Sequence, residues 1–337
     1  MPKVSIVLPN YNYARYLDER IQSLLNQTYT DFELIILDDA STDNSIEVIE
    51  KCTADPRVKT KFYTENSGLP YKRWNDGADL AQGEYLLIAG ADDSCHPTLL
   101  EKLVEKLESH PSVGLAFSQS WGIDGEGNRT HSWKQHTDAL DINRWEINFV
   151  DKGTNELEYL VIRNTIPNAS AVLMRRKVFV DAGKFDVCLR LTSDWMLWAK
   201  MLITSDISFV AEPLNYFRTH SNTVRSNSER TGLHIEESYQ VQHYIIRELQ
   251  LQLQQASIEQ ALEEMAENWV RTLMEGHGNI SKDQNRKIYK IASSIDPNLK
   301  QHLIKQATLH LINKTRVFLE KYKQDFLLLY AYKNSFF

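Results

Sequence analysis

Short apolar runs alternate with segments of helical spacing along about the first 110 residues of the chain. The runs at residues 4–8 and 85–89 suit strands that are buried on both faces, and further strands are predicted at residues 32–37 and 58–63. Between them, apolar residues recur three or four positions apart, as in Leu17, Ile21 and Leu24. Strands that alternate with helices predict βαβ units. We therefore expect an α/β fold in which helices flank a mostly parallel sheet.

The same pattern continues less regularly to about residue 228, where the character of the sequence changes. Further strands are predicted at residues 113–118, 169–174 and 214–219, and Pro97 is predicted to open a helix. Residues 129–152 are polar and aromatic without a clear period. From residue 229 onward, Gln- and Glu-rich helical patterns replace the strands. We therefore expect a sheet domain over residues 1–228 and a C-terminal helical region over residues 229–337.

An aromatic stripe runs along the last predicted helix. It consists of Phe318, Tyr322, Phe326 and Tyr330, which are spaced four residues apart and so share one helix face. Packing against the other helices, a homo-oligomer interface and peripheral contact with a membrane surface all fit this stripe. The sequence does not decide among the three.

Carboxylates stand at the ends of two predicted strands. Asp92 and Asp93 follow residues 85–89, and Asp39 follows residues 32–37. In open α/β sheets, the carboxyl edge of the strands is where ligands bind. Paired oxygen donors suit Mg²⁺ or Mn²⁺, which keep part of their coordination shell for phosphate oxygens. The alternative is a structural role, in which Asp93 or Ser94 caps the following helix.

Charge and cysteine content narrow the class of protein. There are 38 Lys and Arg against 45 Asp and Glu, a formal charge of −7 without a basic stripe, so a nucleic-acid partner is not expected. The three cysteines are too few and scattered for a disulfide framework or a zinc site, which favours a reducing compartment. No run reaches the roughly 18 apolar residues of a membrane span. We expect a cytoplasmic protein, at most peripheral at the inner face of a membrane.

Four separated pieces of the chain together resemble the family 2 glycosyltransferases with the GT-A fold. They are residues 4–12, 37–43, 91–93 and 183–186, the last leading to residues 193–195, and the resemblance spans roughly residues 3–225. Members of this family transfer a sugar from a nucleotide diphosphate sugar, most often uridine-linked, with inversion, and they usually need Mg²⁺ or Mn²⁺. The resemblance therefore implies a Rossmann-like nucleotide-binding sheet of the GT-A type and a hexosyl- or N-acetylhexosaminyl-transferase activity.

The resemblance assigns the nucleotide to the first loop and to the end of the second strand, at Pro9, Tyr11 and Asp39. Tyr11 offers a ring for stacking, and Asp39 offers an acceptor for the imide N–H of uracil, although guanine also has such a donor. The alternative for Asp39 is a helix cap, for which Asp43 is better placed. Lys72 and Arg73 are candidates for pairing with phosphate, or else part of a solvated helix face.

The metal motif departs from the family pattern. The usual motif is Asp-x-Asp, but Gly90 stands at the leading position, which leaves Asp92 and Asp93. By resemblance, Asp93 coordinates the metal at the diphosphate and Asp92 contacts the ribose or the metal shell. His220, in an Arg-x-His segment, is a further candidate ligand, although a lone histidine is more often structural.

The general base of the family matches Asp194, in the segment Ser193-Asp194-Trp195. Inverting transfer needs one base to take the proton of the attacking hydroxyl, and the alternative for Asp194 is a cap on the helix that begins at Trp195. Trp195 and Trp198 fit either an acceptor platform that stacks on a sugar or the hydrophobic core.

These residues predict an inverting, metal-dependent glycosyltransferase for polysaccharide biosynthesis. The donor is expected to be a UDP-sugar, and the acceptor a glycan, a lipid-linked molecule or a cell-envelope polymer. Two alternatives stay open. One is a non-catalytic nucleotide-sugar or glycan-binding protein on the same fold, suggested by Gly90. The other is a nucleotidyltransferase, although a Gly- and Lys-rich phosphate loop is missing at residues 9–12.

Overall fold

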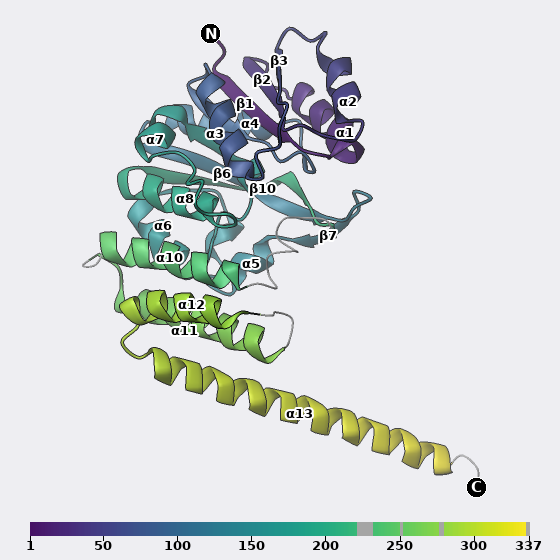
Figure 1. Cartoon of the computed structure of the whole chain (residues 1–337), viewed down its shortest axis with the longest axis vertical. Helices are drawn as coiled ribbons and strands as arrows, with labels where there is room; N and C mark the ends of the chain where they lie inside the picture. The colour runs from purple at the N-terminus through teal and green to yellow at the C-terminus, as the bar shows by residue number, and fades with distance from the viewer. Residues whose placement is uncertain (221–231, 250–251, 276–279, 335–337) are drawn as a thin grey trace.

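The computed structural model describes residues 1–220, 232–249, 252–275 and 280–334, with side chains described as far as residue 316. The aromatic stripe from Phe318 to Tyr330 lies outside the described side chains. A central sheet is covered by helices on both faces, and a stack of helices follows it toward the C-terminus (Figure 1).

The strands of the sheet are hydrogen-bonded in the order β3-β2-β1-β4-β9-β6-β10-β5, with β7 added on β6 and β8 on β10. They are β1 (Val4–Asn10), β2 (Phe32–Asp38), β3 (Val58–Phe62), β4 (Tyr85–Ile88), β5 (Ser94–Cys95), β6 (Val113–Ile123), β7 (Arg129–Ser132), β8 (Phe149–Asp151), β9 (Val172–Arg175) and β10 (Asp206–Arg218). Strands β1 to β4 pair in parallel, as predicted. Strand β9 runs antiparallel between β4 and β6, so the sheet as a whole is mixed.

The helices surround and extend this sheet. They are α1 (Ala14–Leu25), α2 (Ser45–Cys52), α3 (Pro70–Leu80), α4 (Leu99–Ser109), α5 (Lys134–Asp138), α6 (Gly153–Leu160), α7 (Arg176–Asp181), α8 (Ser193–Thr204), α10 (Leu233–Glu248), α11 (Gln255–Met274), α12 (Lys282–Ile295) and α13 (Leu299–Asn334), with 3₁₀ turns η1 (Arg144–Glu146) and η2 (Ala169–Ala171). Helix α4 begins at Leu99 rather than at Pro97, because Ser94–Cys95 forms a short strand and residues 97 and 98 form a turn.

The alternation of side chains along the central strands builds one hydrophobic core on each face of the sheet. In β1, Ile6 and Leu8 point to the core covered by α1, α2 and α4, whereas Val7 points to the core covered by α3, α6 and α8. The continuous apolar runs of β1 and β4 were therefore a correct sign of burial on both faces, whereas β3, which has no such run, is mostly exposed at the edge of the sheet. Residues 129–152, which had no clear period, form β7, α5, η1 and β8 at the end of the sheet.

The C-terminal helices stack on the side of the sheet that carries α6 and α8 (Figure 1). Val241 and Ile245 of α10 belong to the same hydrophobic core as Trp198 of α8. A further core cluster, with Tyr239, Trp269 and Ile288 among its members, joins α10, α11 and α12. Helix α10 is thus shared between the sheet region and the helical stack, and the boundary at residues 228 and 229 stays a prediction.

Within the part of the chain that the structure describes, no helix is both long and apolar enough to span a membrane.

Candidate active site

Parallel pairing brings the ends of three strands to one edge of the sheet. Asn10 of β1 lies opposite Asp38 of β2, and Val7 of β1 lies opposite Ile88 of β4. The predicted residues Tyr11, Asp39 and Asp92 follow these strand ends directly, so they share this edge.

Asp39 is a buried carboxylate that is fixed by residues from outside its own strand. The backbone N–H of Ser67 donates to both carboxylate oxygens at 3.0 Å, and its hydroxyl donates to Oδ2 at 2.7 Å. Arg73 donates from Nε to Oδ1 at 2.5 Å. A carboxylate has about four acceptor positions, so these three donor groups leave room for one further donor. Asp39 does not cap α2; it is Asp43 that accepts the amide of Ser45 at 3.0 Å.

The two basic candidates on α3 have different surroundings. Arg73 is 6% exposed, bridges Asp39 and Asp76, and lies with its guanidinium carbon 3.4 Å from the ring centre of Tyr63. The solvated-face alternative is therefore wrong for Arg73, and its charge is already engaged by two carboxylates. Lys72 is exposed, as expected for a solvated position. Arg73 thus acts on Asp39, a role that the sequence did not reveal.

The first loop is tied to the loop after β2. Asn10 donates its side-chain amide to Asp38 at 2.7 Å and to the Ser41 hydroxyl at 3.1 Å. Asn12 has a left-handed backbone, with φ of 59°, and its side chain accepts the amide of Thr42 at 2.7 Å. Asparagine tolerates this conformation better than most residues. Pro9 lies at the end of β1, and Tyr11 is 43% exposed at the edge of the sheet, where its ring is accessible for stacking.

Asp93 is buried beneath the turn that follows β4. Its Oδ2 accepts the Ser170 hydroxyl at 2.6 Å and the Asn168 amide at 3.3 Å, and its Oδ1 accepts the backbone N–H of Arg218 at 3.0 Å. Burial, and then the neighbouring charge of Asp92, raises the pKa of Asp93 to about 6. Neither Asp93 nor Ser94 caps α4, whose N-cap residue is Thr98.

Asp92 is the accessible member of the pair, and it contacts His220. The His220 Nε2 lies 3.1 Å from Asp92 Oδ2. The imidazole ring lies between two tyrosines of the first loop and α1, with ring centres 5.8 Å from Tyr13 and 5.3 Å from Tyr16. Burial, and then the charges of Asp92 and Asp93, raises the pKa of Tyr13. The sequence singled out neither tyrosine, although both lie in the matched first loop or the helix that follows it.

Arg218 holds the acidic turn in place. Its Nε donates to the backbone carbonyl of Asp92 at 2.6 Å, and its Nη2 donates to Glu19 at 2.7 Å. The Arg-x-His segment therefore contributes two functions to one turn, because Arg218 fixes its backbone and His220 contacts its exposed carboxylate.

The position of Gly90 leaves little room for a side chain. A Cβ atom at this position would lie 3.0 Å from Asp93 Oδ2 and 3.2 Å from the Ser170 hydroxyl. The backbone N–H of Gly90 also donates to that hydroxyl at 2.8 Å. The missing leading carboxylate is thus linked to the close packing of Asp93 and Ser170 against the turn.

The side chains of Asp92 and His220 could bind a divalent cation whose remaining coordination positions are filled by oxygens of the substrate. Among the described residues, no group of three or more His, Cys, Asp and Glu is arranged as a metal centre. Asp92 and His220 provide two donors, and Mg²⁺ is commonly bound through one or two carboxylates together with substrate phosphates. Because both oxygens of Asp93 accept protein hydrogen bonds, this geometry favours Asp92 over Asp93 as the contact. That order is the reverse of the one expected from the sequence.

Asp194 lies in the first turn of α8 and is partly exposed. Helix α8 begins at Ser193 rather than at Trp195, and its N-cap residue is Thr192, so Asp194 does not cap it; the Asp194 carboxylate accepts the amide of Trp195 at 2.7 Å. Tyr71, in the first turn of α3, lies near the start of α8. Burial raises the pKa of its hydroxyl well above the usual range, and the negative charges of Asp194 and Glu237 raise this pKa further. Helix α3 therefore connects Asp39, through Arg73, with Asp194, through Tyr71.

Trp195 and Trp198 are buried in the hydrophobic core, at 5% and 0% exposure. The indole N–H of Trp195 donates to the Leu160 carbonyl at 3.0 Å. Neither ring offers a face to a sugar, so these positions agree with the core alternative and not with an acceptor platform.

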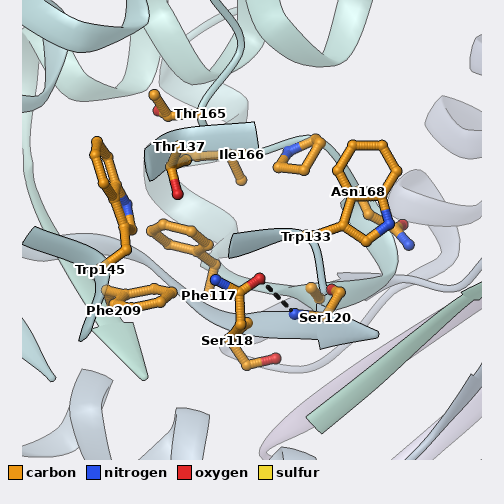
Figure 2. Close-up of a pocket in the computed structure, with 13 residues that line it drawn as sticks. Phe117, Ser118, Ser120, Trp133, Thr137, Trp145, Thr165, Ile166, Asn168 and Phe209 are labelled. Carbon is orange, nitrogen blue, oxygen red and sulfur yellow. Dashed lines mark hydrogen bonds between the residues drawn. The ribbon is translucent and has the colours of Figure 1, made fainter. Parts of the chain in front are cut away.

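A small cavity lies next to the acidic turn. Figure 2 shows the indole rings of Trp133 and Trp145 on opposite sides of it, with Asn168 near Trp133. Its volume is about 10 Å³, which is room for about one water molecule and far less than a sugar ring requires. Asn168 lines this cavity and also binds Asp93, so the cavity belongs to the support of the acidic turn.

Comparison with known proteins identifies the family of the chain. The sequence profile of Glycosyl transferase family 2 matches residues 5–181, more than half of the chain. The chain therefore belongs to the family 2 glycosyltransferases, which excludes the nucleotidyltransferase alternative.

Two relatives of similar sequence are named as glycosyltransferases. An uncharacterized glycosyltransferase of Nostoc sp. is 29% identical over 233 residues, which is 65% of this chain and 65% of the relative. The poly(ribitol-phosphate) beta-N-acetylglucosaminyltransferase TarS of Staphylococcus aureus is 25% identical over 196 residues, which is 56% of this chain and 34% of TarS. The chain spans about a third to two thirds of the length of these two relatives.

Solved structures show the fold. TarS residues 1–349 in complex with UDP-GlcNAc gives a TM-score of 0.63 at 18% identity, covering 90% of this chain and 89% of that chain. The mannosyltransferase PcManGT of Pyrobaculum calidifontis, in complex with GDP-Man and Mn²⁺, gives 0.54 at 16% identity and covers 91% and 84%. The predicted GT-A-like sheet flanked by helices, with helices at the C-terminus, is confirmed.

Proposed function

We propose that this chain transfers a sugar from a UDP-sugar to a glycan, lipid-linked or cell-envelope acceptor, with inversion at the anomeric carbon. The observation that carries the proposal is the Asp39 carboxylate, which is held by Ser67 and Arg73. It lies on the same edge of the sheet as the exposed Tyr11, because the amide of Asp39 donates to the carbonyl of Asn10, the residue before Tyr11, at 2.8 Å. The fixed carboxylate of Asp39 suits the imide N–H of uracil, and the accessible ring of Tyr11 suits stacking on the aromatic face of the base.

The diphosphate would lie toward the acidic turn on the same edge. Asp92 and His220 would hold a divalent cation there, and such a cation acts as a Lewis acid that neutralises charge on the leaving diphosphate. Asp93, Arg218 and Ser170 keep this turn in place from below. Mn²⁺ in the GDP-Man complex of PcManGT, a protein of the same fold, supports a divalent cation here as well.

Asp194 is the proposed general base. It accepts the proton of the acceptor hydroxyl as that oxygen attacks the anomeric carbon, while the bond from the sugar to the diphosphate breaks. Its partly exposed position at the start of α8 leaves the carboxylate accessible to an acceptor. Residues 1–228 would carry the reaction, and residues 229–337 would support it.

The proposal is tested with a panel of sugar nucleotides and acceptors, by measuring release of free nucleoside diphosphate. UDP release that requires both an acceptor and a divalent cation is the expected result. Asp194→Asn is expected to reduce turnover by about 100-fold or more while UDP binding, measured by calorimetry, stays within about twofold. Full turnover by this variant would refute the role of Asp194, and absence of release with every donor would favour a binding protein.

A further inference from the structure

Glu237, on helix α10, is a buried carboxylate that binds the segment leading to Asp194. It is 3% exposed. Its Oε1 accepts the backbone N–H of Arg190 at 2.8 Å, and its Oε2 accepts those of Leu191 at 2.8 Å and Thr192 at 3.1 Å. The Thr192 hydroxyl lies 3.2 Å from the same oxygen. One side chain from the helical region thus accepts three consecutive amides of the sheet region.

This arrangement is chemically unusual for a structural carboxylate. Among the described residues, the hydrogen-bond donors to Glu237 are backbone amides and one hydroxyl, with no cationic side chain. Consecutive N–H groups that converge on one point form a concave anion-binding site. Burial of an ion is costly unless its hydrogen bonds are satisfied, so removal of the carboxylate leaves three N–H groups to find other partners.

The segment that Glu237 holds ends at the proposed base. Thr192 is the N-cap residue of α8, and its carbonyl accepts the first helical amide, that of Met196, at 2.9 Å. Asp194 lies two residues further on. The direction of the Asp194 side chain therefore depends on where the backbone of residues 190–192 is fixed.

Helix α10 is itself fixed, which makes Glu237 a rigid anchor. Val241 and Ile245 of this helix are completely buried in the core that also contains Trp195 and Trp198. On the same face of α10, the negative charge of Glu237, together with the negative charge of Asp194, raises the pKa of the buried Tyr71 hydroxyl. Three elements, α3, α8 and α10, thus meet at the start of α8.

We infer that Glu237 is a positioning residue for the transfer reaction: it orients the first turn of α8, and with it the Asp194 carboxylate, toward the acceptor hydroxyl. The inference rests on the proposed role of Asp194. It gives helix α10 an indirect part in catalysis, through the backbone of residues 190–192, in addition to its part in stability. Because misplacement of a catalytic group by about 1 Å can cost about 100-fold in rate, a modest displacement of residues 190–194 is enough to be measured.

The test compares Glu237→Gln with Glu236→Gln in the full chain. Glu236 lies on the same helix and accepts a hydrogen bond from Gln284, away from the segment at residues 190–192. For Glu237→Gln we expect kcat to fall by about 10- to 100-fold. The dissociation constant for UDP is expected to stay close to that of Glu236→Gln, because Asp39 and its partners are unchanged. The unfolding midpoint is expected to fall by a few degrees, because at least one of the three buried N–H groups loses its acceptor, so kcat is compared well below the midpoint of both variants.

Amide hydrogen exchange supplies a readout that does not depend on turnover. In Glu237→Gln, the amides of residues 190–192 are expected to exchange at least about tenfold faster than in the native chain and in Glu236→Gln, because a carboxamide cannot accept all three N–H groups. Unchanged kcat, unchanged exchange at residues 190–192, exchange that is equally faster throughout the chain, or a kcat loss that follows a loss of UDP affinity would overturn the inference.

Failure of the proposed function gives a different pattern. If Asp194→Asn keeps full turnover, Asp194 is not the base and the inference fails with it, whatever Glu237→Gln does. If Asp194→Asn is inactive and Glu237→Gln has native kcat, only the role of Glu237 is refuted.

Discussion

Asp39 and Asp93 are both buried carboxylates at strand ends, yet their surroundings set different electrostatic states. Asp39 forms an ion pair with Arg73 and accepts two groups of Ser67. Asp93 lies beside a second carboxylate, and the charge of the buried Arg20 only partly offsets the effect of burial on its pKa. Burial therefore dominates the pKa of Asp93, whereas Asp39 has a direct cationic partner in Arg73.

The raised pKa of Asp93 predicts a specific dependence of stability on pH. Between about pH 4 and pH 6, the folded chain keeps a proton on Asp93 that the unfolded chain has lost, so this group stabilises the fold at low pH and the contribution disappears as pH rises through about 6. Asp93→Asn removes the effect. Its unfolding free energy relative to the native chain is expected to rise between pH 4.5 and 6.5, by up to about 1.4 kcal/mol per pH unit. Urea denaturation with a chelator present measures it.

Asp92→Asn is the matched variant for this experiment. Loss of the neighbouring charge is expected to move the transition of Asp93 to lower pH, because the repulsion that raises its pKa is removed. Parallel stability curves for the native chain and Asp93→Asn would contradict the assignment.

At the scale of elements, helix α3 links the two ends of the candidate site. Its first turn supplies Tyr71, next to Asp194, and Arg73, which binds Asp39. The side chain of Asn75 extends the connection, because it bonds the backbone of Phe185 at 2.8 and 3.1 Å, in the segment that precedes α8. One short helix thus fixes parts of the site that lie far apart in the chain.

Replacement of Arg73 by Met is expected to damage both stability and nucleotide binding. The variant leaves the Asp39 carboxylate buried without its counter-charge, which typically costs about 3 kcal/mol. We expect the affinity for UDP to fall by about tenfold or more, since Asp39 is then free to shift. Chemical denaturation and calorimetry measure the two effects.

Lys72→Met is the control on the same helix. Lys72 is exposed, so its loss is expected to change stability by less than about 0.5 kcal/mol. Equal losses of stability in the two variants would show that Arg73 does not act as the counter-charge of Asp39.

At the scale of the whole molecule, the sheet and the helical stack share a core. The buried side chains of α10 pack with those of α8, while α11 and α12 enclose the other side of α10 (Figure 1). Helix α13 extends from this stack as the last element. The sheet region therefore depends on at least one helix beyond residue 228 for complete burial.

A chain ending at residue 228 is expected to be aggregation-prone or to unfold at least about 10 °C below the full chain, because it loses the apolar face of α10. A chain ending at residue 298, which keeps α10 to α12, is expected to lose much less. Thermal unfolding and size-exclusion chromatography of the two chains measure this. A stable, monomeric chain of residues 1–228 would instead support two independent domains.

The elements of the sheet and the acidic ends of its strands were determined by the sequence alone, because both are local. Buried strands require continuous apolar runs, and parallel pairing puts their carboxyl ends on one edge, so Asp39 and Asp92 were found from short windows of sequence. Of their partners, only His220 was a candidate beforehand, through the resemblance to the family, and Arg218 and Glu237 could not be assigned their roles from local patterns. Arg218 lies 125 positions from Asp93, His220 lies 128 from Asp92, and Glu237 lies 45 from Thr192.

Only the tertiary structure decided which side chains are exposed and which are held. Lys72 and Arg73 are adjacent and carry the same charge, yet only Arg73 is buried. Asp92 and Asp93 are adjacent and chemically identical, yet only Asp93 is buried. Trp195 and Trp198 were equally open to two interpretations until their burial was known. The reason is physical: burial and hydrogen bonding depend on segments that meet in space, and local patterns carry no information about which segments those are.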